Sequence, residues 1–553
     1  MLPTLERKGF VMPSWLRWAA TVASCLLLST HAAALTDLQL AEHLKQRFDG
    51  DRTGSCVLAA VVEGEQLARA RFCARAVTPP ADQAAFEIGS VSKTMAAFLV
   101  ADLIEHRGWT LDDPIARHLP EGTRVPRFED QEIRIRHLVS HTAGLPRLPP
   151  GMVPKDVSNP YADLSEAGLL SALADTRLDR APGSTAAYSN FGMMVLSLAV
   201  ARAHGNDLET ALRTRLFDPL GMRQASIRPR DGAVWWQGHT PDGRLAPAWT
   251  IATNLAGVGM VRASLDDMVA YLQAQMGVTH TPLAGPIKCT QQPVAAGFGM
   301  NWSLPVVRGR ALVLHEGGTG GFSSLVAFDP AARKGVVMLA DTTLAELGGL
   351  ADAALPLLVD LPVGTPRRAM PTPPDLLKAL PGEYELAAMN LRLRLWAEDG
   401  QLKAQAQGQA AQTLGYDSRG DFYPLSASYL LRPVPGEGQA GQVNRLLLRQ
   451  GGGVIEAVRA GIDTRPSANN PAWQAFAGEY ALTPQFSIRV FEEAGQLKVQ
   501  GTGQRSISAE QTGPDRIEVR HVGAVIEFHR NDAGAVVRAT LIQGGQSLSG
   551  AKK

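Results

Sequence analysis

The sequence predicts a domain of the α/β (α+β) class, followed by two small all-β modules. Apolar segments long enough for helices follow Ser90 and Asn190, at residues 95–104 and 191–200. Strand-like apolar runs flank the glycine-rich segment 315–321. Residues 376–553 contain an internal repeat in which apolar and polar residues alternate, which is the period of a strand with one buried face.

The composition favours a multidomain enzyme over a nucleic-acid-binding protein. The chain has 553 residues, too many for one domain, and its formal net charge of +1 provides no excess of basic residues for phosphates. The sequence has no glycine-rich phosphate loop, dinucleotide fingerprint or cysteine cluster. We therefore expect chemistry without a cofactor or a metal, and no nucleic-acid partner.

The N-terminus has the pattern of a signal peptide. Basic residues at positions 7, 8 and 17 precede the apolar stretch 18–28, and Ala32-Ala33-Ala34 offers a small-residue cleavage site. The apolar stretch is shorter than the roughly 20 residues of a membrane-spanning helix. We expect residues 1–34 to be a signal peptide, no stable membrane span, and a periplasmic or secreted protein.

Two alternatives stay open at this end of the chain. If translation starts at Met12 instead of Met1, the signal peptide is shorter, and its basic residue Arg17 lies directly before the apolar stretch. The segment Val22-Ala23-Ser24-Cys25 resembles a lipoprotein acylation box, which would make Cys25 a lipidation site. Because the apolar run continues through residues 26–28, cleavage after Ala34 is favoured.

Export permits disulfides, and a predicted hairpin selects one pair of cysteines. If Gly64-Glu65 is a two-residue turn, Glu63 pairs with Gln66, and seven steps along each strand bring Cys56 opposite Cys73. If Glu63 and Gln66 are a hydrogen-bonded pair, pairs an odd number of steps away are non-hydrogen-bonded. In such pairs the Cα atoms lie about 4.5 Å apart and a disulfide can close. We predict a Cys56–Cys73 disulfide, with Cys289 free.

Ser90 and Lys93 form the first candidate catalytic pair. Ser90 is expected to cap a helix, and residues three apart on a helix share a face. Residues 95–100 are all apolar, so the helix has no polar face and should be buried. Burial favours the neutral form of Lys93, which can act as a general base for the Ser90 hydroxyl. The same spacing at Ser549 and Lys552 lies at the chain end without a following apolar helix, so we expect no function there.

Tyr188-Ser189-Asn190 is the second candidate element. A phenol near a lysine can lose its proton more easily and carry protons, and an asparagine amide can hold a substrate carbonyl. The alternative interpretation is a surface turn that leads into the apolar helix 191–200.

The third element is the segment from His315 to Gly321, set between two predicted strands. Glycines there let a substrate backbone lie close to a strand edge, and a free backbone N–H can complete an oxyanion hole. His-x-Gly also occurs at His106 and His521, but only His315 is followed by the glycine-rich stretch.

A fourth pattern, His137-x-x-x-His141, could place two imidazoles on one helical face as metal ligands. It lacks the glutamate of His-Glu-x-x-His and a third ligand, and Thr142 to Pro146 would break the helix at once. We therefore expect no metal site.

In this order the three elements resemble the signature of the serine beta-lactamase and penicillin-binding-protein superfamily: Ser-x-x-Lys, Tyr-x-Asn, then Lys/His-x-Gly. The segments 136–146, 217–222 and 257–268 look similar to that family as well, so the resemblance covers about residues 37–358. Its nearest branches are class C beta-lactamases, DD-carboxypeptidases, D-aminopeptidases and related esterases. The resemblance implies a beta-lactamase/transpeptidase-like domain with an antiparallel sheet flanked by helices.

The resemblance also implies the role of each site residue. Ser90 would be the acylated nucleophile, and Lys93 and Tyr188 the acid-base pair. The N–H groups of Ser90 and Gly318 would form the oxyanion hole. The residues implied to bind substrate or line the pocket are Asn190, His315, Gly317, Gly318 and Thr319.

One departure from the family pattern bears on the substrate. Most beta-lactamases of this type have Lys-Thr-Gly where this chain has His315-Glu316-Gly317. A lysine is a fixed positive charge that suits a carboxylate, whereas a histidine with a pKa near its reference value of about 6.5 is mostly neutral at pH 7. This lowers the expectation of a beta-lactamase, and Glu316 is expected to face away from an anionic substrate.

After the predicted hydrolase domain, 35–360, the chain divides into a proline-rich linker, 361–375, a β module, 376–462, a second linker, 463–472, and a second β module, 473–553. Gly382-Glu383-Tyr384 recurs 96 residues later as Gly478-Glu479-Tyr480. This plan resembles the D-aminopeptidase branch, in which one of two C-terminal barrels sends a loop toward the active site. The alternative is that the modules only bind a partner or the cell wall.

The sequence thus predicts an exported serine hydrolase, most consistent with a peptidase or amidase of the DD-carboxypeptidase or D-aminopeptidase type. The expected substrates are small peptides or peptidoglycan fragments, followed by esters and beta-lactams. The alternatives are a class C-like beta-lactamase, an esterase, or a non-catalytic penicillin-binding sensor protein.

Overall fold

The computed structural model describes residues 34–230, 232–295, 297–387, 391–424, 429–434, 442–450, 453–461, 471–483, 486–493, 496–502, 506–519, 524–531, 533–543 and 546–553. The predicted signal peptide, with Met12 and Cys25, lies outside the described residues except for Ala34, and so does most of the linker 463–472. Among the described residues, no helix is both long and apolar enough to cross a membrane.

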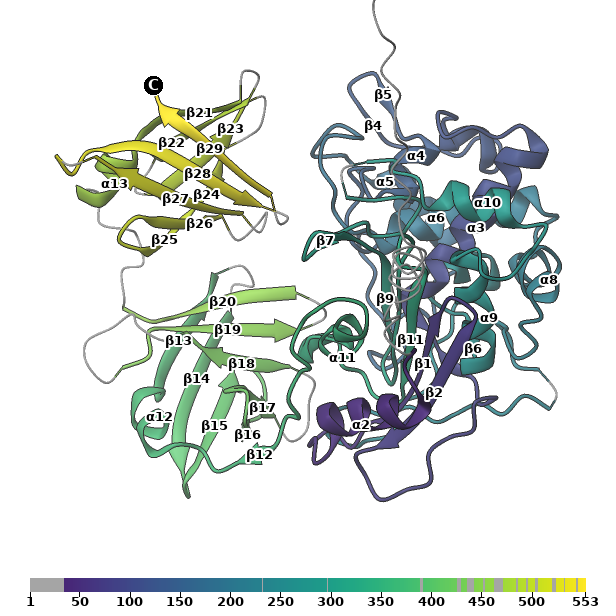
Figure 1. The fold of residues 1–553 in the computed structure, drawn as a ribbon, viewed down its shortest axis with the longest axis horizontal. Helices are drawn as coiled ribbons and strands as arrows, with labels where there is room; N and C mark the ends of the chain where they lie inside the picture. The colour runs from purple at the N-terminus through teal and green to yellow at the C-terminus, as the bar shows by residue number, and fades with distance from the viewer. Residues whose placement is uncertain are drawn as a thin grey trace, which may run out of the picture.

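A five-stranded antiparallel sheet forms the centre of the N-terminal region (Figure 1). Its strands lie in the order β2 (Gln66–Cys73), β1 (Cys56–Glu63), β11 (Lys334–Ala340), β10 (Ser323–Asp329) and β9 (Val313–Gly318). Along β1, Leu58 and Ala60 belong to one hydrophobic cluster, and Val57 and Ala59 belong to another. Because both faces of the sheet are covered, β1 is apolar at successive positions instead of alternating.

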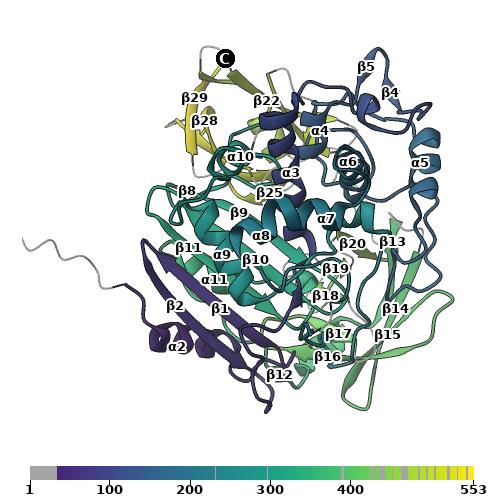
Figure 2. The same cartoon turned by 90° about the vertical axis from the view of Figure 1, so that its right-hand side faces the viewer.

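Helices cover both faces of this sheet (Figure 2). One face packs against α3 (Ser92–Arg107) and α9 (Leu265–Gln275), and the other against α2 (Asp37–Phe48) and α11 (Ala351–Ala354). The remaining helices of this region are α4 (Ile135–Val139), α5 (Glu166–Asp175), α6 (Asn190–Ala203), α7 (Leu208–Leu212), α8 (Asp218–Leu220) and α10 (Ala284–Thr290). Three short strand pairs complete it: β3 (Phe86–Glu87) with β6 (Arg262–Ala263), β4 (Arg127–Phe128) with β5 (Gln131–Glu132), and β7 (Val306–Val307) with β8 (Arg310–Ala311). The predicted fold class is confirmed.

The predicted hairpin and disulfide are both present. Strands β1 and β2 pair with Glu63 opposite Gln66 and Cys56 opposite Cys73, and the two cysteines are bonded with Cα atoms 3.9 Å apart. Cys289 is free. The register follows from the two-residue turn, because each step along one strand is matched by one step along the other.

Helix α3 is buried on every side, as its sequence predicts, but it begins later than expected. All residues from Ser92 to Leu103 are buried. Ser90 lies in a preceding 3₁₀ turn, η1 (Gly89–Val91), and α3 has no side-chain cap. The predicted capping role of Ser90 is therefore wrong, and its hydroxyl is free for other partners.

In the described residues from 369 onward, the chain forms two nine-stranded antiparallel sheets. The first runs β12 (Ala369–Met370), β16 (Gln412–Asp417), β15 (Gln401–Ala406), β14 (Leu391–Glu398), β13 (Gly382–Leu386), β20 (Gly453–Arg459), β19 (Arg445–Gln450), β18 (Leu430–Pro433) and β17 (Phe422–Pro424). A further pairing of β16 with β17 closes the strands from β16 to β17 into a barrel, and β12 adds to the outside of this ring at β16.

The second sheet repeats the plan of the first. Its order is β24 (Ile507–Ser508), β23 (Gln496–Gly501), β22 (Phe486–Glu493), β21 (Gly478–Thr483), β29 (Gln546–Lys552), β28 (Val536–Gln543), β27 (Ala524–Arg530), β26 (Arg516–Val519) and β25 (Glu510–Gly513). A short helix precedes the repeated Gly-Glu-Tyr strand in each sheet: α12 (Pro374–Ala379) lies before β13, and α13 (Pro471–Phe476) lies before β21. The repeated tyrosines are equivalent, because the Tyr384 hydroxyl donates to Leu380 O and the Tyr480 hydroxyl donates to Phe476 O.

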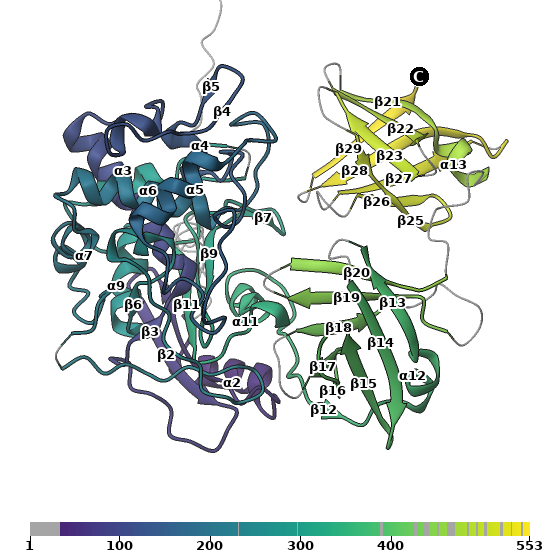
Figure 3. The same ribbon diagram turned by 180° about the vertical axis from the view of Figure 1, so that it is seen from behind.

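Figure 3 shows the first β module beside α11, with the second module next to the first. Leu430 of the first module joins the hydrophobic cluster that contains α2 and α11. Arg445 and Glu510 form an ion pair of 3.0 Å between the two modules. The exact division of the chain into domains stays a prediction.

Candidate active site

Ser90, Lys93 and Tyr188 meet in one place, although the sequence separates them. Lys93 Nζ and the Tyr188 hydroxyl each lie 2.8 Å from Ser90 Oγ. Lys93 Nζ also donates to Val258 O at 2.5 Å, and the side chain is fully buried. One hydroxyl thus contacts two groups that can move protons, and this arrangement can activate a nucleophile.

Tyr188 is positioned by the start of α6. Ser189 caps this helix by accepting from Gly192 N at 2.9 Å, and its hydroxyl donates to Pro146 O at 2.6 Å. Asn190 Nδ2 donates to the Tyr161 hydroxyl at 3.0 Å, while Asn190 Oδ1 is buried without a partner among the described residues. Asn190 can therefore offer its amide oxygen to a substrate N–H.

Two glycines let strand β9 approach the serine turn. A Cβ atom at Gly317 would overlap Ile88 O and Ser324 Oγ, and one at Gly89 would overlap Gly318 N. Gly89 also has a φ of +50°, which disfavours other residues. The Ser324 hydroxyl holds the contact by donating to Ile88 O at 2.7 Å. This approach brings the backbone N–H groups of residues 90 and 318 into one region, as an oxyanion hole requires.

The electrostatics favour a neutral lysine and a protonated tyrosine. Burial, together with the nearby charge of Arg147, holds the pKa of Lys93 well below its ordinary value. Burial raises the pKa of Tyr188 to about 12, and the hydrogen bond with Ser90 only partly opposes this. The expectation that Tyr188 loses its proton more easily is therefore wrong, because a neutral Lys93 supplies no positive charge to stabilise a tyrosinate.

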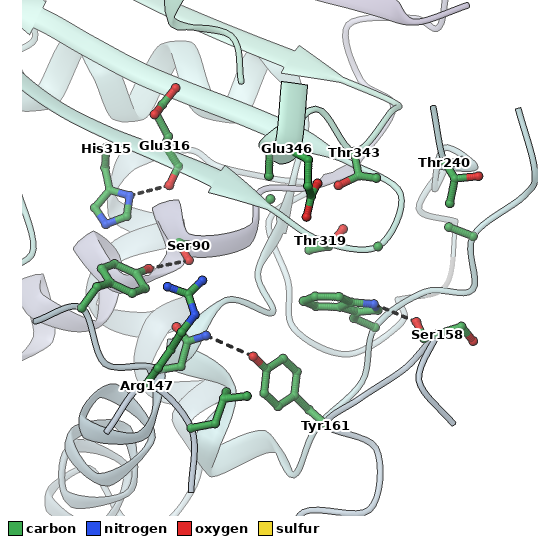
Figure 4. Close-up of a pocket in the computed structure, with 18 of the residues that line it drawn as sticks. Ser90, Arg147, Ser158, Tyr161, Thr240, His315, Glu316, Thr319, Thr343 and Glu346 are labelled. Atoms are coloured by element: carbon green, nitrogen blue, oxygen red, sulfur yellow. Dashed lines mark hydrogen bonds between the residues drawn. The ribbon is translucent and has the colours of Figure 1, made fainter. Parts of the chain in front are cut away.

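His315 is neutral and presents a hydrogen-bond acceptor. Burial, with a smaller contribution from Lys93, lowers the pKa of His315 to about 4. His315 Nδ1 lies 2.6 Å from Glu316 O, so this nitrogen carries the proton and Nε2 is left bare (Figure 4). Glu316 extends to the opposite side from His315, toward Gly349, because side chains alternate along β9. This is the expected direction for Glu316.

The two histidines of the His-x-x-x-His pattern have different surroundings. His141 stacks on Tyr188 with ring centroids 4.4 Å apart, and burial lowers the pKa of His141 to about 3. His137 Nδ1 accepts from Arg134 N at 3.1 Å. In the part of the chain that the structure describes, no group of three or more metal-ligating side chains occurs. His141 thus supports the tyrosine ring.

Ser549 and Lys552 take part in the second β module. Both lie on β29, where Ser549 Oγ is 3.0 Å from Thr540 Oγ1 and Lys552 Nζ donates to Ala475 O at 2.9 Å. The two side chains therefore have separate partners, unlike Ser90 and Lys93.

Comparison with known proteins agrees with this geometry. The sequence profile of the family described as Beta-lactamase matches residues 40–359. The chain belongs to the beta-lactamase family. It is therefore a hydrolase of the serine beta-lactamase and penicillin-binding-protein type.

Several relatives within the beta-lactamase family show its range of activities. D-alanyl-D-alanine-carboxypeptidase/endopeptidase AmpH of Escherichia coli K12 is 24% identical, over 63% of this chain and 96% of the relative. Penicillin-binding protein 4 of Amycolatopsis lactamdurans is 27% identical, over 62% and 97%. Esterase EstB of Burkholderia gladioli is 29% identical, over 50% and 82%.

A solved structure, the beta-lactamase/D-alanine carboxypeptidase of Yersinia pestis, is 22% identical with a TM-score of 0.48. It covers 57% of this chain and 96% of its own.

The beta-lactamase-type site opens into a cavity of about 970 Å³. Ser90, Tyr188, Asn190, His315, Gly318 and Thr319 line it, so the structure brings these predicted residues together. Lys93 and Gly317 lie behind its wall, since Lys93 is fully buried and Gly317 packs against Ile88 O.

Sequence reasoning did not find three other lining residues, Arg147, Tyr161 and Trp249. The segment between α4 and α5, which contains Arg147 and Tyr161, has no helix or strand, and Trp249 precedes the 3₁₀ helix Thr253–Val258. Such connections lack a periodic pattern that would reveal them. The one available signal was the position of Arg147 directly after the family-like segment 136–146.

Proposed function

We propose that this protein is an exported serine peptidase or amidase of the DD-carboxypeptidase or D-aminopeptidase type, which forms an acyl-enzyme on Ser90. The observation that carries the proposal is the contact of Ser90 Oγ with both Lys93 Nζ and the Tyr188 hydroxyl, each at 2.8 Å. The relatives named as carboxypeptidase and penicillin-binding protein support the same class of substrate.

Acylation would begin with the neutral amine of Lys93. Lys93 takes the proton of Ser90, and Ser90 Oγ attacks the substrate carbonyl carbon. The carbonyl oxygen becomes negative and accepts hydrogen bonds from the N–H groups of Ser90 and Gly318. Tyr188, still protonated, donates to the leaving nitrogen as the C–N bond breaks, and the proton on Lys93 then restores Tyr188.

Deacylation would run the same route in reverse. A water molecule takes the place of the leaving group beside Tyr188 and attacks the ester. Tyr188 accepts a proton from the water as it passes its own proton to Lys93, and Lys93 then protonates Ser90 Oγ as the ester C–O bond breaks, which releases the acid product. No step needs a metal or an organic cofactor, because the chain supplies the nucleophile, the base, the acid and the oxyanion donors.

An esterase is the second candidate, because EstB is among the relatives and His315 carries no positive charge at the position of the usual lysine. The Cys56–Cys73 disulfide supports a periplasmic or secreted location, since such bonds persist in oxidising compartments. A non-catalytic sensor would have no need of two proton carriers on one serine hydroxyl.

The test is intact-protein mass spectrometry of the wild type and of Ser90→Ala, each treated with a fluorophosphonate and with a penicillin. We expect a mass gain in the wild type that is absent from Ser90→Ala, with the penicillin adduct decaying over time. An adduct that never decays would favour the sensor protein instead. Absence of any fluorophosphonate adduct on the wild type would contradict the proposal.

A further inference from the structure

The cavity contains a positive charge that the catalytic steps do not use. The guanidinium of Arg147 extends into the cavity toward Ser90 (Figure 4), and its Cζ lies 5.5 Å from the Tyr188 ring centroid. Among the residues that the structure describes, none forms an ion pair or hydrogen bond with this guanidinium, and the side chain is exposed. The other arginine that lines the cavity, Arg244, is already bonded to Asp242 at 2.7 Å.

The backbone of Arg147 is held by the start of the helix that positions Tyr188. Arg147 O accepts from Asn190 N at 2.9 Å and from Phe191 N at 3.1 Å. The neighbouring Pro146 O accepts from Ser189 Oγ at 2.6 Å. Arg147 is therefore a long side chain on a fixed base, directly beside the tyrosine.

Three other titratable groups at the cavity, His315, Lys93 and Glu346, provide no positive charge for an anion. His315 presents the bare lone pair of Nε2, which repels a carboxylate. Lys93 is neutral and buried behind Ser90. Glu346 also lines the cavity and adds negative charge on the side of Thr319 and Thr343 (Figure 4). An anionic group of a substrate is therefore attracted to one end of the cavity, the end with Arg147 and Tyr188.

We propose that Arg147 binds the α-carboxylate of the leaving amino acid, and that the enzyme therefore cleaves the last residue from the C-terminus of short peptides. The inference rests on the proposed function, in which Tyr188 protonates the leaving nitrogen. The leaving residue must then lie on the Tyr188 side of Ser90, where Arg147 is the adjacent charge. A planar guanidinium can hold both oxygens of a carboxylate. Arg147 thus takes over the anion-binding role of the lysine that His315 replaces.

The experiment compares one peptide in two forms, diacetyl-L-lysyl-D-alanyl-D-alanine with a free C-terminal carboxylate and the same peptide as its C-terminal amide. The ratio of kcat/KM for the acid to kcat/KM for the amide is measured in the wild type, Arg147→Gln, Arg147→Lys and Arg244→Gln. Because both peptides use Lys93 as the base, the ratio of the two peptides at one pH is independent of the effect that the Arg147 charge has on the pKa of Lys93.

We expect the acid to be preferred by the wild type and the ratio to fall about 30-fold in Arg147→Gln, the size of a lost charge-assisted hydrogen bond. Arg147→Lys should retain part of the preference, and Arg244→Gln should retain all of it. A ratio near one in the wild type, or one unchanged in Arg147→Gln, would overturn the inference.

Fluorophosphonate labelling of Ser90 separates this inference from the proposed function. If Ser90 is labelled in the wild type but neither peptide is cleaved, the assignment of Arg147 is wrong and the acylated serine stands. If Ser90 is not labelled, the proposed function itself fails. Labelling of Arg147→Gln by the neutral reagent also shows that this variant is folded.

Discussion

At the scale of single residues, burial decides the chemistry of the site. Lys93 is fully buried with one carbonyl and one hydroxyl as partners, so its charged form is disfavoured. The same burial keeps the proton on Tyr188 and leaves His315 neutral. In the proposed mechanism these three side chains serve as a base, an acid and an acceptor, because the surrounding protein disfavours the charged form of each of them.

Lys93→Met tests this account through stability as well as activity. The pKa of Lys93 in the folded protein lies well below its ordinary value, so between the two values the unfolded chain binds a proton that the folded chain does not. The free energy of unfolding of the wild type should therefore rise with pH across that window, and Lys93→Met lacks this contribution. We expect the stability of the variant, relative to the wild type, to be greater at about pH 6 than at about pH 9.

Thermal unfolding of both proteins at the two pH values measures this difference. Fluorophosphonate labelling should be lost in Lys93→Met at either pH. In the wild type, the labelling rate should fall as pH drops through the lowered pKa, because the base becomes protonated. Parallel pH profiles of stability for the two proteins would contradict a buried neutral lysine.

At the scale of elements, the site depends on the contact of strand β9 with the turn η1. Gly317 and Gly89 allow two backbones to touch, and Ser324 bonds across the contact. The contact places the edge of β9 beside Ser90, so this backbone packing would set the positions of the N–H groups in the proposed oxyanion hole.

Gly317→Ala should separate the two elements. The new methyl group would overlap Ile88 O and Ser324 Oγ, and we expect a loss of about 1–3 kcal/mol in the free energy of unfolding, as for other overpacked sites. The matched control is Gly318→Ala, where the nearest atoms to the methyl group are Ala345 Cβ at 3.7 Å and Phe322 O at 3.8 Å. Denaturant unfolding of both variants is the measurement, and equal midpoints would refute the close contact.

At the scale of the whole molecule, a buried ionic network joins the hydrolase region to the first β module. Arg367 is 2% exposed and contacts Asp417 at 3.1 Å and Asp421 at 2.5 Å, both fully buried. Its backbone N–H donates to Asp51 Oδ2, and its guanidinium donates to Leu347 O. The segment predicted as a proline-rich linker, 361–375, is therefore anchored at Arg367 and also contains β12.

Arg367→Met should destabilise the protein by about 3 kcal/mol, because it leaves two buried carboxylates with fewer partners. Arg392→Met, which removes an exposed ion pair with Glu385, should leave the unfolding transition unchanged. Differential scanning calorimetry of both variants is the measurement. A transition in Arg367→Met that matches the wild type would show that the network does not stabilise the interface.

Much of this architecture was accessible from local patterns. The apolar run after Ser90 predicted a buried helix, and the turn at Gly64-Glu65 predicted the Cys56–Cys73 pairing by counting residues. The alternating residues of the repeat predicted two β modules. These inferences succeed because periodicity and turn length act over short stretches of chain. The helix start at Ser92 was missed, because the 3₁₀ turn at Ser90 is held by contacts with the distant strand β9.

The sequence alone determined the candidate nucleophile and its lysine, the disulfide, the strands and helices that carry them, and the order of the three motifs. The tertiary structure decided the protonation of Lys93, Tyr188 and His315, the direction of Glu316, and the presence of Arg147 beside Ser90. A pKa depends on burial and on charges from other segments, and a cavity depends on loops that only meet after folding. Neither is a property of a short stretch of chain.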